Sequence, residues 1–418
     1  MVPLARINGR GVARTVPLVQ LPPPPPAAEL ADRVGRFQAG LRGCGIDAAV
    51  LVQSADLVYL AGTAQNAHLL VPAEGDPVLL VRRDLERARE ESALERVEAF
   101  TSLRALPQAL ASIGVSPAAR LGFELDVIPA ASYLRYGSLL GEAEIVDCMP
   151  ALWGARSRKT AWEVERIRAA CAQSGAAFER APSLLRAGRS EAEVLDDLFA
   201  CMREHGHEGG IRFRGINSEF LFGQVLAGES ASVPGPTETP FHGPGLSTAQ
   251  GRGVSRRLLQ RGDAVAVDIS GLSEGYTSDQ TRTFFLGEPD PELLAALELC
   301  RAILAECVAL LVPGTPASAL YERGLEIATG AGHAEHFMGA TAQRVRFVGH
   351  CIGLELNEPP YLASGWAERL ALGNVVAIEP KLQFAGRGAV GVENSYLITP
   401  AGPVQLTAGS DEAVVVDA

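Results

Sequence analysis

The sequence predicts an α/β protein of two domains. Its 418 residues are enough for two or three domains, each with a core of its own. Segments with helical periodicity alternate with short apolar, β-branched segments separated by turn residues, which is typical of mixed helices and hairpins. Acidic residues stand inside some of these apolar segments, where an unpaired charge is costly, so the same pattern also indicates a functional site.

Residues 1–26 are predicted to form an N-terminal tail. The prolines from Pro22 to Pro26 end this tail and favour an extended spacer. The residues before them include scattered arginines but no apolar stretch of the kind found in secretory signals, so we expect no such signal.

Residues 27–155 are predicted to form the first domain. A helical pattern in ELADRVGRFQAGLRGCG is followed by the buried strand DAAVLVQ. The segment HLLVPAEGDPVLLVRR then predicts a hairpin that turns at AEGD. A small α/β domain therefore precedes the segments that carry the acidic residues.

Residues 156–418 are predicted to form the second domain, in which four helix starts can be recognised. Two of them have the spacing of a capping box, at Thr160 with Glu163 and at Ser190 with Glu193. The other two are marked by a capping residue followed by proline, at Asp290 and at Thr315.

Two hairpins of the second domain carry paired acidic residues. Asp268 and Asp279 stand in VAVDISGLSEGYTSDQTRTFFL, and Glu379 and Glu393 stand in VVAIEPKLQFAGRGAVGVENSYLI. A turn centred on Gly386 places Glu379 opposite Glu393, and side chains alternate across a strand, so each hairpin can direct two carboxylates to one point. The alternative is that acids near turns are solvated surface residues, but here they interrupt apolar strands.

His350, in FVGHCIGLELNEPP, completes a candidate metal site. Four carboxylates and one imidazole suit two divalent ions, because the formal charges of the four anions and the two ions cancel. Oxygen ligands with one histidine fit Mn²⁺, Co²⁺ or Zn²⁺ better than a thiolate site would. Among these ions we expect Mn²⁺, with Co²⁺, Zn²⁺ and iron as alternatives. A pair of ions can activate water and polarise a carbonyl at the same time. We therefore expect two divalent ions at the following residues: Asp268, Asp279, His350, Glu379 and Glu393.

This ordered set resembles the pita-bread metallopeptidases, a family that includes Xaa-Pro aminopeptidase, prolidase and methionine aminopeptidase, with creatinase as a relative that is not a peptidase. The resemblance rests on the spacing Asp-x₁₀-Asp, on GHCIGLELNEPP, and on the Glu-Pro pair followed by a second glutamate. It covers nearly the whole chain after residue 27. It implies a creatinase-type N-terminal α/β domain followed by a pita-bread domain in which the five residues named above hold two metals. It also implies that Glu379 relays a proton from the attacking water to the leaving nitrogen.

The chain departs from the family pattern at positions around the substrate. Asn357 stands where proline-specific members usually have a second histidine, and Gly235 stands where they commonly have a loop histidine. Gly391 replaces a frequent arginine, and Gln224 replaces a histidine of similar chains. The replaced groups normally bind or protonate the substrate. The resemblance therefore implies hydrolytic activity more strongly than it implies specificity for X-Pro bonds. We expect Asn357 and Gln224 to contact the substrate.

Lys381, His242 and Tyr276 are further candidates for the site. Lys381 faces Gly391 in the expected register, and it is one of only two lysines among 37 basic residues. It either acts in catalysis, as an anion clamp or proton donor, or only neutralises the carboxylates. His242 either replaces the missing loop histidine in catalysis or lies on the surface. Tyr276 either binds substrate near the metals or packs in the core.

Composition narrows the partners of this protein. A formal net charge of −12 disfavours nucleic acid and anionic membranes. No apolar run approaches the roughly 18 residues that a membrane span requires. The cysteines are odd in number and lack metal-site spacing, which indicates reduced thiols. We therefore expect a cytoplasmic protein. We further expect a homodimer that acts on a small peptide or amide.

The function favoured by these observations is a dinuclear metal-dependent hydrolase of a peptide or peptide-like amide bond, similar to Xaa-Pro peptidases. A second hypothesis is a non-peptidase family member that cleaves a C–N bond, or eliminates a group, in a small metabolite. A third is a binding protein without catalysis, which is disfavoured because all five ligand positions are retained.

Overall fold

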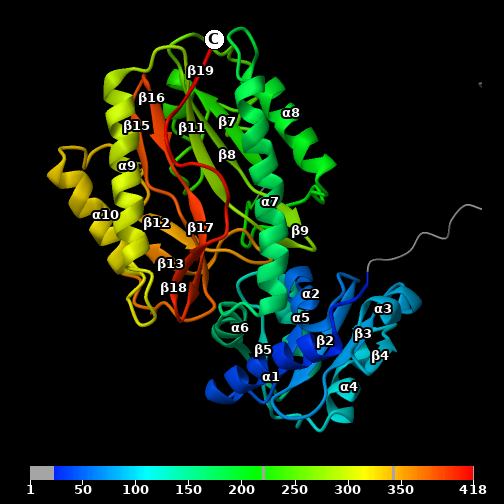
Figure 1. Cartoon of the computed structure of the whole chain (residues 1–418). Coiled ribbons are helices and arrows are strands. Elements are labelled where there is room, and N and C mark those ends of the chain that lie inside the picture. Colours follow the sequence, from blue (N-terminus) through cyan, green and yellow to red (C-terminus); the bar gives the residue numbers. More distant parts are fainter. Residues whose placement is uncertain (1–22, 219–221, 341–343, 418) are drawn as a thin grey trace, which may run out of the picture.

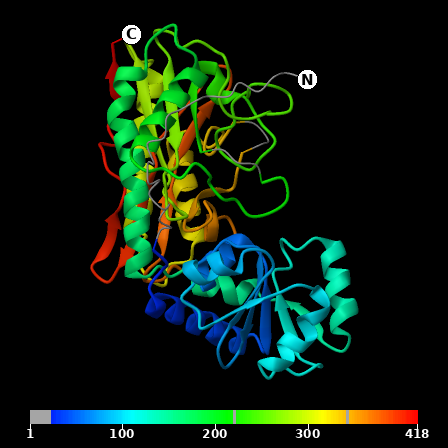
Figure 2. The same cartoon turned by 90° about the vertical axis from the view of Figure 1, so that its right-hand side faces the viewer.

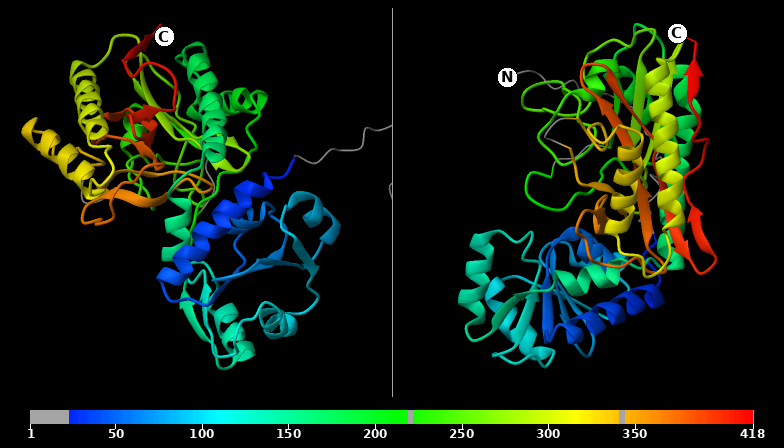
Figure 3. Two further views of the ribbon diagram at one scale, coloured as in Figure 1. Left: turned by 60° about the horizontal axis from the view of Figure 1, so that its bottom comes forward. Right: turned by 90° about the vertical axis from the view of Figure 1, so that its left-hand side faces the viewer.

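The computed structural model describes residues 23–218, 222–340 and 344–417, so most of the predicted N-terminal tail lies outside the described residues. Two bodies are visible in Figure 1, a smaller one coloured blue to cyan and a larger one coloured green to red. The views of Figures 2 and 3 agree that the smaller body lies at one end of the larger one. Helix α7 (Ala161–Leu184) begins near this junction and runs along the larger body.

The smaller body is built on a mixed sheet with the strand order β4-β3-β2-β1-β5-β6. Its central strands read as continuous apolar runs because both faces of the sheet are covered. The strands are β1 (Ala48–Leu51), β2 (Ala67–Pro72), β3 (Val78–Val81), β4 (Arg96–Ala99), β5 (Arg120–Phe123) and β6 (Glu144–Asp147). The predicted strand and hairpin of this domain are β1 and the pair β2–β3.

Helices pack on both faces of this sheet. On one face Phe37 and Leu41 share a core with Leu51 and Leu69, and on the other Phe123 and Tyr136 share one with Leu80. The helices are α1 (Ala27–Gly43), α2 (Ser54–Ala61), α3 (Leu85–Glu91), α4 (Leu106–Ser112), α5 (Ala130–Leu140) and α6 (Met149–Arg156), with a short 3₁₀ turn, η1 (Leu103–Ala105).

The larger body contains a four-stranded sheet, β19-β11-β8-β7, and a five-stranded sheet, β13-β12-β14-β17-β18. The first is formed by β7 (Gly223–Ala227), β8 (Ala264–Ile269), β11 (Gln280–Leu286) and β19 (Val414–Val416). The second is formed by β12 (Phe347–Cys351), β13 (Glu358–Ala363), β14 (Val375–Ile378), β17 (Asn394–Thr399) and β18 (Gly402–Gln405). The larger body also contains two small two-stranded sheets. One pairs β9 (Leu272–Ser273) with β10 (Tyr276–Thr277), and the other pairs β15 (Lys381–Phe384) with β16 (Gly388–Gly391).

Two pairs of helices cover the outer faces of these sheets, as Figure 1 shows. Helix α7 and α8 (Glu191–Glu204) pack on the four-stranded sheet through Phe178 and Leu198, which share a core with Val267. Helices α9 (Pro291–Ala309) and α10 (Ser318–Gly330) pack through Ile303 and Leu320, which share a core with Val376 of β14. A short 3₁₀ turn, η2 (Gly228–Ser232), follows β7. The carboxylate-bearing hairpins therefore lie between two layers of helix.

Three of the four predicted helix starts are confirmed, and one is displaced. Both capping boxes form, and Asp290 caps the first turn of α9. The expected start at Thr315 is wrong, because α10 begins at Ser318. The preceding residues pair instead with the segment before β14: the amide of Ala317 donates to the carbonyl of Glu368. Within the described residues, no helix is long and apolar enough to cross a membrane.

Candidate metal centre

The first acidic hairpin places Asp268 and Asp279 next to each other. Strands β8 and β11 pair so that Asp268 lies opposite Thr281, and β7 adds Gln224 on its other side. Asp279 stands two residues before Thr281 and therefore faces the same side of the sheet. The side chain of Ser270 fixes its carboxylate by donating to Oδ1 over 3.1 Å.

The predicted register of the second hairpin is confirmed. Ile378 pairs with Asn394, and Lys381 pairs with Gly391, so the intervening Glu379 and Glu393 face each other. The turn contains Gly386 with a φ of 72°, a left-handed conformation that glycine adopts without strain.

His350 joins the two hairpins from the neighbouring strand. Its Nε2 lies 3.7 Å from Oδ2 of Asp279 and 3.6 Å from Oε1 of Glu379. Its Nδ1 lies 3.1 Å from the carbonyl oxygen of Cys351, which can only accept, so Nδ1 carries the proton and Nε2 presents a lone pair to the carboxylates. Burial lowers the pKa of His350, which favours the neutral form that binds metals.

These side chains fit a divalent cation. Ligand atoms of Asp279, His350 and Glu393 all lie within 4.8 Å of one another, and the three residues are buried. In the described part of the chain, Oε1 of Glu393 is a buried oxygen without a hydrogen-bond partner. Its other oxygen accepts a hydrogen bond of 2.6 Å from Thr281. A buried carboxylate with one free oxygen beside a bare imidazole nitrogen is a donor set for Mn²⁺, Co²⁺, Zn²⁺ or iron.

The carboxylates repel one another, and this changes their pKa values. Burial, with the neighbouring Glu393 and Asp268, raises the pKa of Asp279 well above its usual range. Burial raises the pKa of Glu393 to about 8, with Glu379 and Asp268 adding to the effect and Lys381 opposing it. Cations near these groups relieve the repulsion, so the cluster favours positive charge.

Lys381 points into this cluster. Its Nζ lies 2.6 Å from Oε2 of Glu379, 3.2 Å from Oδ2 of Asp268 and 3.4 Å from Oε2 of Glu393. The side chain is 1 % exposed, and the ammonium also lies 5.0 Å from the centre of the Phe241 ring. Burial alone would lower the pKa of Lys381, but the three carboxylates raise it well above its usual range, so the lysine is charged.

A cavity of about 500 Å³ opens beside the centre, within the range of small-molecule sites. Four of the expected metal ligands reach it: Asp268, Asp279, His350 and Glu379. Two of the expected substrate-binding residues, Gln224 and Asn357, also line it. Gln224 contacts Oδ2 of Asp268 through Nε2 at 3.5 Å.

His242 lies in the same cavity and fills the space beside Gly235. A Cβ atom at residue 235 would lie 2.5 Å from Cδ2 of His242. The His242 ring therefore takes the volume that a side chain at 235 would occupy. Its Nε2 is bonded to the carbonyl oxygen of Thr237, and burial lowers its pKa.

The structure does not bring Tyr276 to this cavity, which corrects the expectation that it binds substrate. Its hydroxyl donates to Oε1 of Glu163 over 2.9 Å, and its ring meets Trp162 edge-on. The turn at Gly275 directs β10 toward α7, so Tyr276 packs near the junction of the two bodies and is 1 % exposed.

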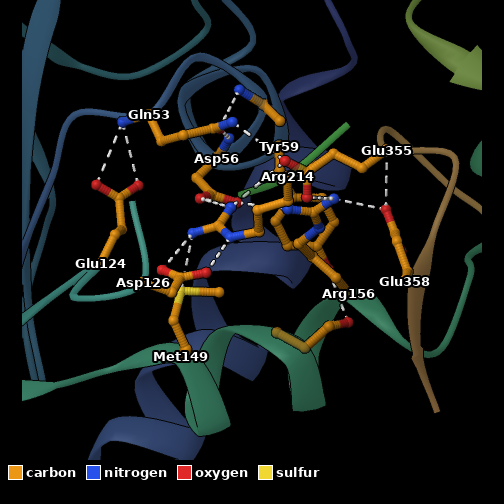
Figure 4. Close-up of polar contacts among 12 residues, drawn as sticks. Gln53, Asp56, Tyr59, Glu124, Asp126, Met149, Arg156, Arg214, Glu355 and Glu358 are labelled. Atoms are coloured by element: carbon orange, nitrogen blue, oxygen red, sulfur yellow. Dashed lines mark hydrogen bonds and ion pairs between the residues drawn. The ribbon is translucent and has the colours of Figure 1, made fainter. Parts of the chain in front are cut away.

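Arg214 and Arg252 line the cavity, and neither was singled out by the sequence patterns. The guanidinium of Arg214 is held by residues of the smaller body, donating to Oδ2 of Asp56 over 2.9 Å and to Oδ1 of Asp126 over 3.0 Å (Figure 4). Arg156 extends this network to Glu355 and Glu358, with distances of 3.0 Å and 2.5 Å (Figure 4). Contacts between residues so far apart in the chain leave no local sequence signal. One wall of the cavity is thus fixed by the smaller body.

The profile of metallopeptidase family M24 matches residues 165–400, and the creatinase/prolidase N-terminal domain matches residues 33–158. The chain belongs to metallopeptidase family M24. The expected architecture, a creatinase-type domain followed by a pita-bread domain, is therefore confirmed. Metallopeptidases of this family use divalent metals, in agreement with the buried cluster of acids and His350.

Relatives of known name match the chain over almost its whole length. The probable dipeptidase PepE of Mycobacterium tuberculosis is 28% identical over 400 residues, which cover 92% of this chain and 96% of the relative. The Xaa-Pro dipeptidase of Pyrococcus horikoshii is 25% identical over 375 residues, which cover 88% and 95%.

Solved structures agree with these sequence matches. The dipeptidase PepE of Mycobacterium ulcerans superposes with a TM-score of 0.79 at 27% identity, covering 94% of this chain and 100% of that one. The Xaa-Pro dipeptidase of Bacillus anthracis has the same fold, with a TM-score of 0.80 at 24% identity and coverage of 93% and 100%.

Proposed function

We propose that this protein hydrolyses the peptide bond of short peptides, with X-Pro dipeptides as the first candidates. The observation that carries the proposal is the convergence of His350 with the two acidic hairpins at the floor of a small cavity. The dipeptidases among its relatives support this choice. They also disfavour the alternative of C–N cleavage or elimination in a small metabolite.

A divalent ion held by Asp279, His350 and Glu393 would supply an activated water and would polarise the scissile carbonyl. Glu379 is suited to carry the proton from the water to the leaving nitrogen, because it lines the cavity. Lys381 holds its Oε2 at 2.6 Å, which leaves Oε1 as the proton-carrying oxygen. His242 and Asn357 line the wall of the cavity and would orient the substrate.

Arg252 gives the cavity a positive group for an anionic substrate. It lies near enough to His242 to contribute to lowering the pKa of that imidazole. A dipeptide has a free carboxylate close to its scissile bond, whereas a longer peptide does not. A guanidinium binds carboxylates through paired hydrogen bonds, so Arg252 favours dipeptides over longer chains.

Several finer expectations are part of the same proposal. The domains span residues 27–155 and 156–418 after a tail of residues 1–26. The metal is Mn²⁺, with Co²⁺, Zn²⁺ or iron as alternatives, and the protein acts as a cytoplasmic homodimer. Analytical ultracentrifugation tests the oligomeric state.

The test is a hydrolysis screen with protein stripped of metal and reloaded separately with Mn²⁺, Co²⁺ and Zn²⁺. Ala-Pro, Leu-Pro and Arg-Pro-Pro are compared with Ala-Ala and Leu-Leu. We expect metal-dependent cleavage of at least one dipeptide, and loss of it in Asp279→Asn, which removes a buried ligand while keeping its size. Cleavage that survives in Asp279→Asn, or no cleavage of any peptide with any metal, contradicts the proposal.

A further inference from the structure

The acidic cluster contains two separate positions for a cation. The first lies among Asp279, His350 and Glu393, whose ligand atoms are mutually close and include an unpartnered oxygen. The second lies among Asp268, Glu379 and Glu393, where the ammonium of Lys381 is within 3.4 Å of an oxygen of each.

Two of the carboxylates lie between these positions. Glu379 turns Oε1 toward His350 and Oε2 toward Lys381. Glu393 turns Oε2 toward Lys381 and keeps Oε1 without a partner in the described part of the chain. Carboxylates that bridge two cation positions are what a pair of metal ions would need, but here a side chain of the protein already stands at one of them.

The lysine and a second ion cannot share this position. Divalent ions of this kind bind oxygen at about 2.0–2.2 Å, so an ion held by the same three oxygens would overlap the ammonium and be repelled by it. Lys381 also has little room to leave, because its side chain is 1 % exposed and its ammonium packs beside the ring of Phe241.

Charge alone does not decide between one ion and two. Four carboxylates with the lysine and one divalent ion sum to −1, and a second ion changes the sum to +1. Both sums are equally close to neutrality, so the number of ions depends on the space available. The ammonium of Lys381 already occupies the second position.

We propose that this centre holds one divalent ion, at Asp279, His350 and Glu393, and that the ammonium of Lys381 replaces the second ion. The lysine is thus a resident cation that orients Glu379 and screens the carboxylates in place of a metal. This revises the expectation of two ions from the sequence. It rests on the metal dependence of the proposed function but not on the substrate, so failure of peptide cleavage leaves it standing.

The experiment counts bound metal. Protein freed of metal is titrated with Mn²⁺, and the bound ion per chain is measured by elemental analysis and by electron paramagnetic resonance. We expect one ion per wild-type chain, with the resolved hyperfine lines of an isolated ion. In Lys381→Met, which keeps most of the apolar stem, we expect two ions per chain and the broadened spectrum of a coupled pair.

The matched control is Lys159→Met, which removes the only other lysine of the chain. Lys159 is also buried and paired, 2.9 Å from Glu358, but it lies outside the centre, so its loss should leave one ion bound. Two coupled ions in the wild type overturn the proposal, and so does a single ion in both the wild type and Lys381→Met. No bound ion in the wild type overturns it together with the proposed metal dependence. If Lys381→Met does not fold, the bound ions are counted in Lys381→Gln instead, where two ions are again expected. The spectrum of the wild type then provides the second test.

Discussion

Lys381 and Gly391 lie opposite each other in the second acidic hairpin, and the stem of the lysine covers the glycine. A Cβ atom at residue 391 would lie 2.5 Å from Cγ of Lys381, closer than carbon atoms can approach. The missing side chain at 391 is therefore what allows the lysine to reach the carboxylates. The lysine at residue 381 therefore requires the glycine at residue 391, which lies across the hairpin turn from it.

This relationship predicts a specific coupling between substitutions. Gly391→Ala should destabilise the protein by about 1–3 kcal/mol, the usual cost of overpacking a filled core. Lys381→Ala removes the Cγ atom, so it should relieve most of that cost in the double variant. Lys381→Met also removes the charge but keeps Cγ, and should give no relief. Urea unfolding of the single and double variants measures both cycles. Equal coupling energies with Ala and with Met contradict the steric explanation.

The hairpin register could be predicted from the sequence, because alternation and one glycine turn leave few ways to pair the strands. The same reasoning predicted the acidic ligands, since an unpaired acid is costly inside an apolar strand. The role of Lys381 was left open, because it depends on how three carboxylates from separate segments meet around its ammonium.

Other parts of the site depend on contacts that no local pattern records. Tyr276 was misplaced because the fold of its short hairpin toward α7 is decided by packing against Trp162 and Glu163. Arg214 was missed because its partner Asp56 lies 158 residues away, in the other body.

We expect Arg252 to select substrates with a free carboxylate. Arg252→Gln should raise KM for an active dipeptide by about tenfold or more, because a charge-assisted hydrogen bond contributes about 1.5–3 kcal/mol. The C-terminal amide of the same dipeptide lacks the negative charge and serves as the control. Steady-state kinetics on the pair measure the ratio. A similar loss for acid and amide would show that Arg252 does not bind the carboxylate.

We expect Arg156 to stabilise the junction of the two bodies. Its guanidinium is 2.6 Å from Asp56 and 3.0 Å from Glu355, and all three side chains are at most 2 % exposed. Arg156→Met takes from each of these buried carboxylates one of its two guanidinium partners, the other being Arg214. Breaking a buried ion pair typically costs about 3–5 kcal/mol.

The control for Arg156 is Arg96→Met, which removes an exposed ion pair of 2.9 Å with Glu98. Exposed pairs contribute about 0–1 kcal/mol. The loss of unfolding free energy should therefore be several-fold larger in Arg156→Met than in Arg96→Met. Chemical denaturation of the full chain measures both. Comparable losses would mean that the buried network contributes no more than a surface pair.

His68 should make the smaller body sensitive to acid. Its Nε2 lies 2.9 Å from the hydroxyl of Tyr136, and its side chain packs against Phe100. Burial lowers the pKa of His68 to about 4, with Arg82 adding to the effect. In the unfolded chain a histidine takes up its proton near pH 6.5, so between about pH 6.5 and 4 the unfolded state binds more protons than the folded one.

The contribution of the neutral His68 ring to the free energy of unfolding is therefore fully present above pH 6.5, and it is lost as the pH drops toward 4. The loss should reach about 3 kcal/mol, because each unit of pKa difference is worth about 1.4 kcal/mol. His68→Gln keeps a polar partner for Tyr136 and cannot take up this proton. The difference between the wild type and this variant in urea unfolding should therefore change over this pH range and level off below pH 4. A nuclear magnetic resonance titration of His68 reports the same pKa directly, and a midpoint near 6.5 would show that burial does not hold the ring neutral.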